Sequence, residues 1–194
     1  ALLVVGCDED EIAMDGGADA GVGDGGAGGG TPGIAVDPTS GLRTTEAGGM
    51  ASFTIELESR PAADVTIALS SSDEDEGTVS PTSVTFTPEN WDAPQDVTIT
   101  GVDDPVADGD QDYTIVTVEA SSDDAGYAGL DPDDVQVTND DDETPGVTVT
   151  PSEGLETDEA GGTDSFDIVL DAAPVANVTV ALSSSDAAEG TLTL

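Results

Sequence analysis

The 194-residue sequence repeats itself, and this repeat limits the possible folds more than any other feature. Gly33 aligns with Gly146, and the 49 residues that start at each point match without a gap at about 27 positions. A repeat at a fixed spacing marks a structural unit used more than once. We therefore expect a complete unit at residues 33–145 and the first part of another at 146–194. The second unit stops before half its length, which suggests a longer array.

Apolar residues alternate with polar ones in seven short stretches of the complete unit. Such alternation predicts half-buried strands, and clusters of Gly, Pro, Asp and Ser separate the stretches. The pattern predicts an all-β fold, a seven-stranded antiparallel immunoglobulin-like sandwich, without the cysteine pair of antibody domains. We expect Trp91 to plug the core or cover a sheet edge. The predicted strands lie at residues 34–36, 53–57, 65–69, 84–86, 97–99, 113–117 and 135–137.

The first 32 residues differ from the rest of the chain. Residues 1–6 are an apolar run that looks like the remnant of a signal peptide, and Cys7 follows in a sequence that resembles a bacterial lipobox. We expect a lipid on Cys7 that anchors an exported protein in the cell envelope, with the outer membrane or cell surface favoured over the inner membrane. Residues 7–32 are rich in Gly and acids, which predicts a flexible tether.

The charge of the chain excludes several classes of function. There are 43 Asp and Glu residues, two Lys and Arg residues and no His, which gives a net charge of -41. Nucleic-acid binding requires Lys and Arg to neutralise phosphates, so nucleic acid is not a partner. His-based catalysis and His-ligated zinc are excluded as well. The acidity favours partners that are hard cations such as calcium.

Acidic residues follow alternate predicted strands. In an antiparallel sandwich these strands end at the same pole, where like charges would repel unless cations lie among them. Calcium accepts six to eight oxygen ligands in flexible geometry and is preferred here over magnesium. An acidic surface that binds nothing is the alternative, and an EF-hand is excluded because Tyr113 stands where its loop needs Gly. The acids expected at this pole are Glu46, Asp73, Asp103, Asp104, Asp108, Asp110, Asp112, Asp140, Asp141 and Asp142.

Four motifs make the chain similar to the Calx-β domains, a family of seven-stranded calcium-binding modules. They occupy residues 45–49 (TEAGG), 72–73 (SD), 101–110 (GVDDPVADGD) and 137–142 (VTNDDD). The chain departs from the family at Asp110 or Asp112, where the family has Glu, and residues 127–134 form a longer insertion. The resemblance implies calcium ligands at Glu46, Asp73, Asp103, Asp104, Asp110, Asp140, Asp141 and Asp142, with Glu159 and Asp186 as their equivalents in the second unit.

These observations predict a non-catalytic, calcium-binding, tandem-repeat lipoprotein that serves as a calcium-stiffened stalk or adhesion scaffold. The alternative is a module that binds an extracellular polysaccharide or protein. A polysaccharide site would need exposed aromatic residues near the acidic pole, and Tyr113 and Tyr127 are the candidates. Paired carboxylates can catalyse glycoside hydrolysis, but no motif in the sequence marks a catalytic pocket, so we expect no enzyme.

Overall fold

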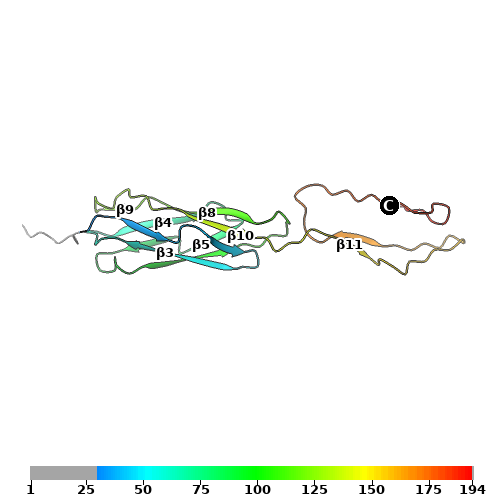
Figure 1. The fold of residues 1–194 in the computed structure, drawn as a ribbon, viewed down its shortest axis with the longest axis horizontal. Helices are drawn as coiled ribbons and strands as arrows, with labels where there is room; N and C mark the ends of the chain where they lie inside the picture. The colour runs from blue at the N-terminus through cyan, green and yellow to red at the C-terminus, as the bar shows by residue number, and fades with distance from the viewer. Residues whose placement is uncertain (1–29, 194) are drawn as a thin grey trace, which may run out of the picture.

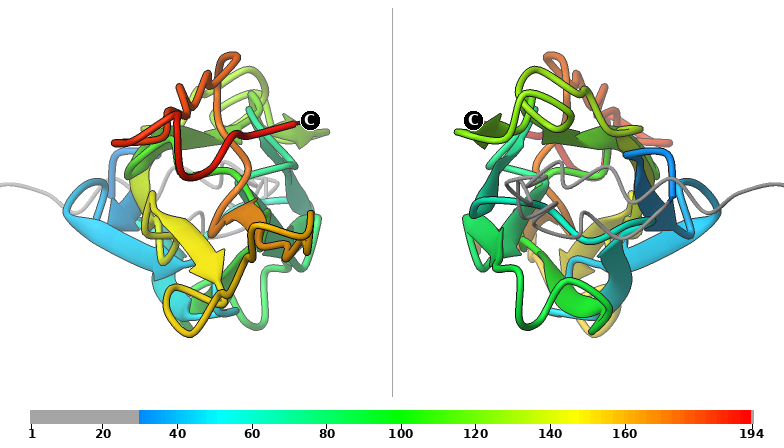
Figure 2. Two further views of the ribbon diagram at one scale, coloured as in Figure 1. Left: turned by 90° about the vertical axis from the view of Figure 1, so that its right-hand side faces the viewer. Right: turned by 90° about the vertical axis from the view of Figure 1, so that its left-hand side faces the viewer.

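The computed structural model describes residues 30–193, and the predicted lipid site at Cys7 lies outside them. The described chain is elongated, with a complete sandwich followed along the long axis by a smaller two-stranded unit (Figure 1). Views along that axis show the strands of the sandwich arranged around it (Figure 2). Residues 30–193 contain strands and turns and no helix, which confirms the prediction of an all-β fold.

Two sheets form the sandwich, which we call the first unit. One has the order β1-β3-β7-β5, and the other has the order β2-β10-β8-β4-β6 with β9 paired to β4. All neighbours are antiparallel except β2 and β10, which run parallel. The strands are β1 (Ile34–Asp37), β2 (Leu42–Thr45), β3 (Met50–Leu57), β4 (Val65–Ser71), β5 (Gly77–Ser80), β6 (Ser83–Phe86), β7 (Gln95–Gly101), β8 (Gln111–Thr117), β9 (Ser121–Ser122) and β10 (Val135–Asp140).

All seven predicted strands are present, and β2, β5 and β9 are additional. The predicted first strand is β1, which pairs with β3. The chain then crosses to the opposite sheet, where β2 pairs with β10. Gly41, with a φ of 78°, lies in the turn between β1 and β2, a conformation that favours glycine. This crossing places the end of β2 beside the end of β10.

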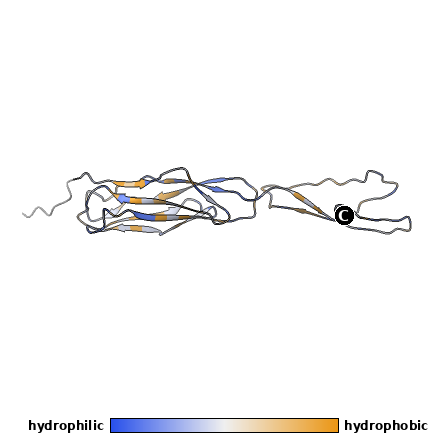
Figure 3. Ribbon diagram, turned by 60° about the horizontal axis from the view of Figure 1, so that its bottom comes forward, coloured by the Kyte–Doolittle hydropathy of each residue, from blue (hydrophilic) through white to orange (hydrophobic). Residues whose placement is uncertain are grey.

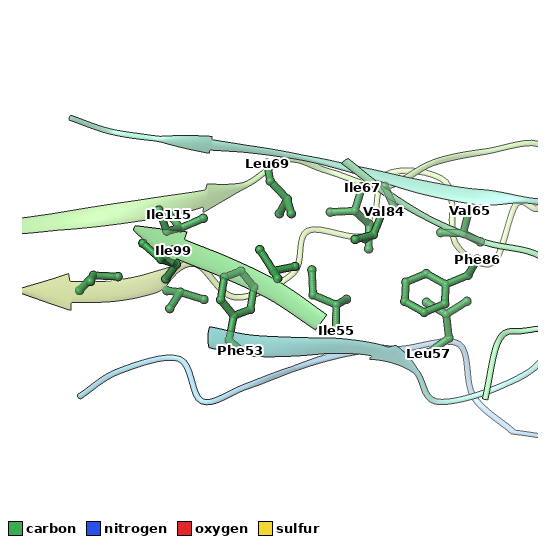
Figure 4. Packing of buried hydrophobic residues seen from close by; sticks show 14 of the residues in the cluster. Phe53, Ile55, Leu57, Val65, Ile67, Leu69, Val84, Phe86, Ile99 and Ile115 are labelled. Carbon is green, nitrogen blue, oxygen red and sulfur yellow. The ribbon is translucent and has the colours of Figure 1, made fainter. Parts of the chain in front are cut away.

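The core lies between the two sheets, where alternate residues of facing strands point inward. Phe53, Ile55 and Leu57 of β3 face the side chains of β4 and β6 in Figure 4 and are at most 4 % exposed. Burial of each such side chain contributes roughly 1.5–3 kcal/mol to the free energy of folding. Trp91 packs against this core as a partly buried residue, as expected. The aliphatic core therefore holds the first unit together.

The second unit repeats the antiparallel pair that β1 and β3 form in the sandwich. Its strands are β11 (Val147–Thr150) and β12 (Asp167–Leu170). Val147 pairs with Leu170 in the same register in which Ile34 pairs with Leu57.

The two units differ in burial. Val178 and Val180 are 52 % and 45 % exposed, whereas their counterparts Val65 and Ile67 are fully buried. Figure 3 shows apolar residues on both β11 and β12. The described part of the second unit thus keeps the pairing of the first and lacks its core.

Candidate metal centre

The acidic end of the first unit is where β2, β7 and β10 terminate. Thr45, the last residue of β2, pairs with Asp140, the last residue of β10, and the Glu46 backbone N–H donates to the Asp140 carbonyl at 3.1 Å. β7 ends at Gly101, and Asp103 follows it by two residues. A Cβ on Gly101 would lie 2.3 Å from the Thr45 carbonyl oxygen, so this close approach of strands requires glycine.

Five carboxylates gather in two overlapping groups at this end, and we call them the Glu143 cluster. Carboxylate oxygens of Glu46, Asp141 and Glu143 come within 4.8 Å of one another, and so do those of Asp103, Asp142 and Glu143. Glu143 belongs to both groups and joins them. One oxygen of Glu143 is buried without a hydrogen-bond partner. Such an arrangement offers several oxygen ligands at once, which is the donor set that calcium prefers.

Glu46 is the buried member of the Glu143 cluster. The residue is 2 % exposed, and its Oε2 accepts a hydrogen bond from the Asp142 backbone N–H at 3.4 Å. The pKa of Glu46 is raised to about 7, chiefly by burial and also by the hydrogen bond to Glu143 and the charge of Asp141, while the Asp142 N–H acts to lower it. An ionised carboxylate at this depth is costly unless a cation compensates it.

Glu143 and Asp141 respond differently to the same surroundings. The hydrogen bond with Glu46 lowers the pKa of Glu143, but burial and the neighbouring carboxylates outweigh it, so the pKa is raised. The pKa of Asp141 is lowered because the backbone N–H groups of Glu143 and Gly109 donate to it, at 2.8 Å and 2.6 Å. Asp141 is therefore ionised at neutral pH, while Glu46 and Glu143 retain protons more readily.

A second group, the Glu76 cluster, consists of Glu76, Asp104 and Asp108, whose carboxylate oxygens also lie within 4.8 Å of one another. Burial raises the pKa of Glu76, and the charges of Asp108, Asp73 and Asp104 add to the effect, while a hydrogen bond from Asn139 lowers it. The clusters are adjacent in sequence because Asp103 belongs to one and Asp104 to the other. The segment that follows β7 thus supplies a carboxylate to each cluster.

Arg43 holds two of the predicted ligands. Its guanidinium Nη2 donates to Asp110 Oδ2 at 2.6 Å and also contacts Asp140. These two hydrogen bonds raise the pKa of Arg43. Arg43 offsets part of the negative charge at this corner, so Asp110 and Asp140 have a cationic partner that the Glu143 cluster lacks.

The remaining predicted ligands lie outside both clusters. Asp112 Oδ1 accepts a hydrogen bond from Thr138 Oγ1 at 2.6 Å, and Asp73 Oδ1 accepts one from the Asp75 N–H at 3.1 Å. In the second unit, Asp186 Oδ1 accepts from the Ala188 N–H at 2.9 Å, and Glu159 is exposed. Neither residue joins a carboxylate group among residues 30–193. Ligation by these four residues stays a prediction.

Glu76 and Glu143 were not predicted as ligands. Glu76 immediately precedes β5, a strand with too few apolar residues to be recognised, so its position at the acidic end was hidden. Glu143 directly continues the run Asp140 to Asp142, and extension of that run by one residue would have found it.

Both tyrosines are buried, which removes the expected basis for sugar stacking. Tyr113 is 3 % exposed and Tyr127 is fully buried, and the Tyr127 hydroxyl donates to the Ser59 carbonyl at 2.5 Å. The aromatic side chains proposed for a polysaccharide site are therefore part of the core.

Among residues 30–193, no helix has the length and apolarity needed to cross a membrane. No family model matches the sequence, and no curated protein matches it.

Solved structures similar to the chain include β-sandwich domains. The apo form of the Calx CBD1 domain is 16% identical, with a TM-score of 0.45, over 57% of this chain and 96% of that one. The calcium binding domain CBD12 of CALX1.1 is 18% identical, with a TM-score of 0.46, over 61% of this chain and 50% of that one. WR4, a C. elegans MSP family member, is 16% identical, with a TM-score of 0.36, over 56% of this chain and 96% of that one. At such TM-scores, the description of the fold rests on the strands and core of the chain itself.

Proposed function

We propose that the first unit binds calcium at its acidic end and that the bound ions stiffen the junction with the unit that follows. The Glu143 cluster provides one place for an ion and the Glu76 cluster provides another. Calcium suits both because it accepts many oxygen ligands in irregular geometry, whereas magnesium requires a near-ideal octahedron. The protein acts as a non-catalytic structural element in this proposal.

The observation that carries the proposal is the burial of Glu46. Its carboxylate is packed against Asp141 and Glu143, and both cationic side chains of the chain are engaged elsewhere. Arg43 pairs with Asp110 and Asp140, and Arg60 Nε donates to the Pro88 carbonyl at 2.8 Å. A buried carboxylate without a cation is expensive, and a divalent ion would supply the missing charge.

Stiffening follows from the loop between β7 and β8, which joins the clusters to the second unit. Asp104 Oδ1 accepts from the Val106 N–H at 2.7 Å, and Asp141 accepts from Gly109. Between these two hydrogen-bonded points of the loop lies Ala107, whose backbone N–H donates to the carbonyl of Ala173 in the second unit. Ions that fix Asp104 and Asp141 would therefore also fix the loop on which the second unit rests.

The cellular setting extends this proposal. The lipobox-like sequence at Cys7 and the acidic tether would attach the array to a membrane of the cell envelope through a lipid. A calcium-stiffened stalk or adhesion scaffold for an extracellular partner fits such a location. Labelling of the expressed precursor with a radioactive fatty acid would test the anchor, and a Cys7→Ser variant that is labelled equally would disprove it.

The test of calcium binding is a thermal melt of the full chain, followed by circular dichroism at matched ionic strength with calcium, magnesium or chelator. We expect calcium to raise the melting temperature well above the value in chelator, because an ion that binds only the folded state stabilises it. Magnesium should have a smaller effect. Coincident melts in all three solutions would leave the acids as a solvated surface.

Two charge-matched variants identify the site. Glu46→Gln removes the buried carboxylate, and Glu56→Gln removes an exposed one from β3. We expect the first to lose most of the calcium-dependent shift and the second to keep it. Equal loss in both variants would mean that calcium acts on the overall charge and has no specific site.

A further inference from the structure

A chain of buried polar groups runs from the core to the Glu76 cluster. The Tyr113 hydroxyl lies 3.1 Å from Thr44 Oγ1, and Thr44 Oγ1 lies 2.9 Å from Asn139 Oδ1. Asn139 Nδ2 lies 3.3 Å from Glu76 Oε2 and 3.1 Å from the Val102 carbonyl oxygen. Thr44 is fully buried, and Asn139 is 1 % exposed. Buried polar groups in such a chain are costly unless every one is satisfied.

The chemistry of the partners fixes the direction of this chain. A carboxylate and a backbone carbonyl can only accept, so the Asn139 group that faces Glu76 and Val102 must be the NH₂. Its carbonyl oxygen then accepts the hydroxyl proton of Thr44. Since Thr44 has a single proton to give, its oxygen accepts from Tyr113.

Asn139 thereby ties together the chain segments that carry the Glu76 cluster. Glu76 immediately precedes β5, and Val102 lies between the end of β7 and Asp103. The same two residues are also joined by a backbone hydrogen bond from the Val102 N–H to the Glu76 carbonyl at 3.0 Å. Glycine at position 101 leaves room for the amide, because a Cβ there would lie 2.5 Å from Asn139 Oδ1.

We propose that Asn139 is a positioning residue for a metal ion at the Glu76 cluster. Its amide orients the Glu76 carboxylate and holds the start of the Asp103–Asp104 segment, so that the carboxylates of Glu76, Asp104 and Asp108 face one ion. One amide proton of Asn139 goes to the Glu76 carboxylate and the other to the Val102 carbonyl. No other residue among 30–193 supplies a side-chain donor to Glu76. This inference rests on the proposed calcium binding.

The first experiment measures calcium binding to the full chain by isothermal titration calorimetry. Asn139→Leu removes both amide donors and keeps a similar volume. Loss of an outer residue that orients a ligand typically weakens metal binding by about 10–100-fold, and we expect this for the ion at the Glu76 cluster. The ion at the Glu143 cluster should bind as in the unchanged chain.

Thr44→Val is the matched control because it cuts the same buried chain one step earlier. This variant leaves the hydrogen bond from Asn139 to Glu76 in place while Asn139 Oδ1 loses its donor. We expect a lower melting temperature in chelator for both variants and weaker calcium binding for Asn139→Leu alone. If Thr44→Val weakens calcium binding equally, Asn139 serves stability only and the proposal is wrong.

A second measurement uses the unchanged chain and does not depend on the folding of a variant. The side-chain NH₂ resonances of Asn139 are followed by NMR while calcium is added, with Gln136 as the exposed reference on the same strand. We expect the Asn139 signals to move with saturation and those of Gln136 to stay. Stationary Asn139 signals in a chain that binds calcium overturn the positioning role alone, whereas absence of calcium binding overturns the proposed function too.

Discussion

Ala107 and Ala173 are joined through their backbones, with the Ala107 N–H donating to the Ala173 carbonyl at 3.1 Å. The Ala173 N–H donates in turn to the Pro105 carbonyl at 2.8 Å. Val106 and Ala173 thereby form a parallel β-bridge between the two units. The loop that carries Asp104 and Asp108 is therefore also a docking segment.

Ala173→Pro tests the role of this bridge. Proline removes the N–H that reaches Pro105, so the second unit should move more freely against the first. Spin labels on cysteines placed at the exposed residues Thr82 and Ser152, in a Cys7→Ser background, would report the distance distribution. With calcium we expect a broader distribution in the variant. Ala176→Pro, at an exposed position, is the control and should leave the distribution unchanged.

The buried Glu46 predicts how stability depends on pH. Its pKa is raised from 4.5 to about 7 in the folded chain, so folding favours the protonated form. This contribution is fully present below pH 4.5 and is lost as the pH rises through about 7. In chelator, the melting temperature should therefore rise as the pH is lowered from 8 to 5. Glu46→Gln should make the melting temperature less dependent on pH.

Calcium affinity should depend on pH in the opposite direction to the melting temperature in chelator. Binding requires an ionised carboxylate, so calcium affinity should fall as the pH is lowered through about 7. Calorimetric titrations at several pH values would show this trend. A constant affinity between pH 8 and pH 6 would mean that Glu46 is not a ligand.

Removal of Arg43 should increase the response to calcium. Arg43→Met leaves Asp110 and Asp140 without their cation, so the melting temperature in chelator should fall by a few degrees. The calcium-induced shift should grow because two more carboxylates become available. Arg60→Met removes the same charge at a residue that binds the Pro88 carbonyl, and it serves as the control. Equal shifts in both variants would contradict a local role for Arg43.

Tyr127 should matter for stability and not for calcium. Its hydroxyl bonds the Ser59 carbonyl, and the Ser59 N–H and Oγ lie within 3.2 Å of it. Tyr127→Phe leaves these buried groups unsatisfied and should destabilise the fold by about 1–3 kcal/mol in urea denaturation. The calcium affinity of this variant should equal that of the unchanged chain, and a loss of affinity would show that the clusters depend on the whole core.

The sequence was sufficient for the strands whose buried positions are apolar. β2 escaped prediction because its buried residue is Thr44, whose hydroxyl is satisfied inside the protein. β5 escaped because its buried residue is Gly77, which is kept small by the Tyr113 ring. A pattern of apolar residues cannot reveal a strand that buries a hydroxyl or a glycine.

The acidic end was predictable as a region because alternate strands of a sandwich end at one pole. Which of its acidic residues form the clusters and which pair with Arg43 was not predictable. It depends on the position of Arg43, which pairs with Asp110 and Asp140, and on the segment after β10, which places Glu143 beside Glu46. Such contacts are set by side-chain packing, and the order of residues along the chain does not encode them in a simple pattern.

The shared register of the β1–β3 and β11–β12 pairs makes their strands interchangeable in principle, so β1 could pair with β12 of the neighbouring unit. Repeat proteins are prone to such strand exchange. The connection between β1 and β3 is short, whereas exchange would close a connection roughly tenfold longer at an additional entropic cost of about 2 kcal/mol. Each first strand therefore pairs more readily with the strand of its own unit than with that of its neighbour.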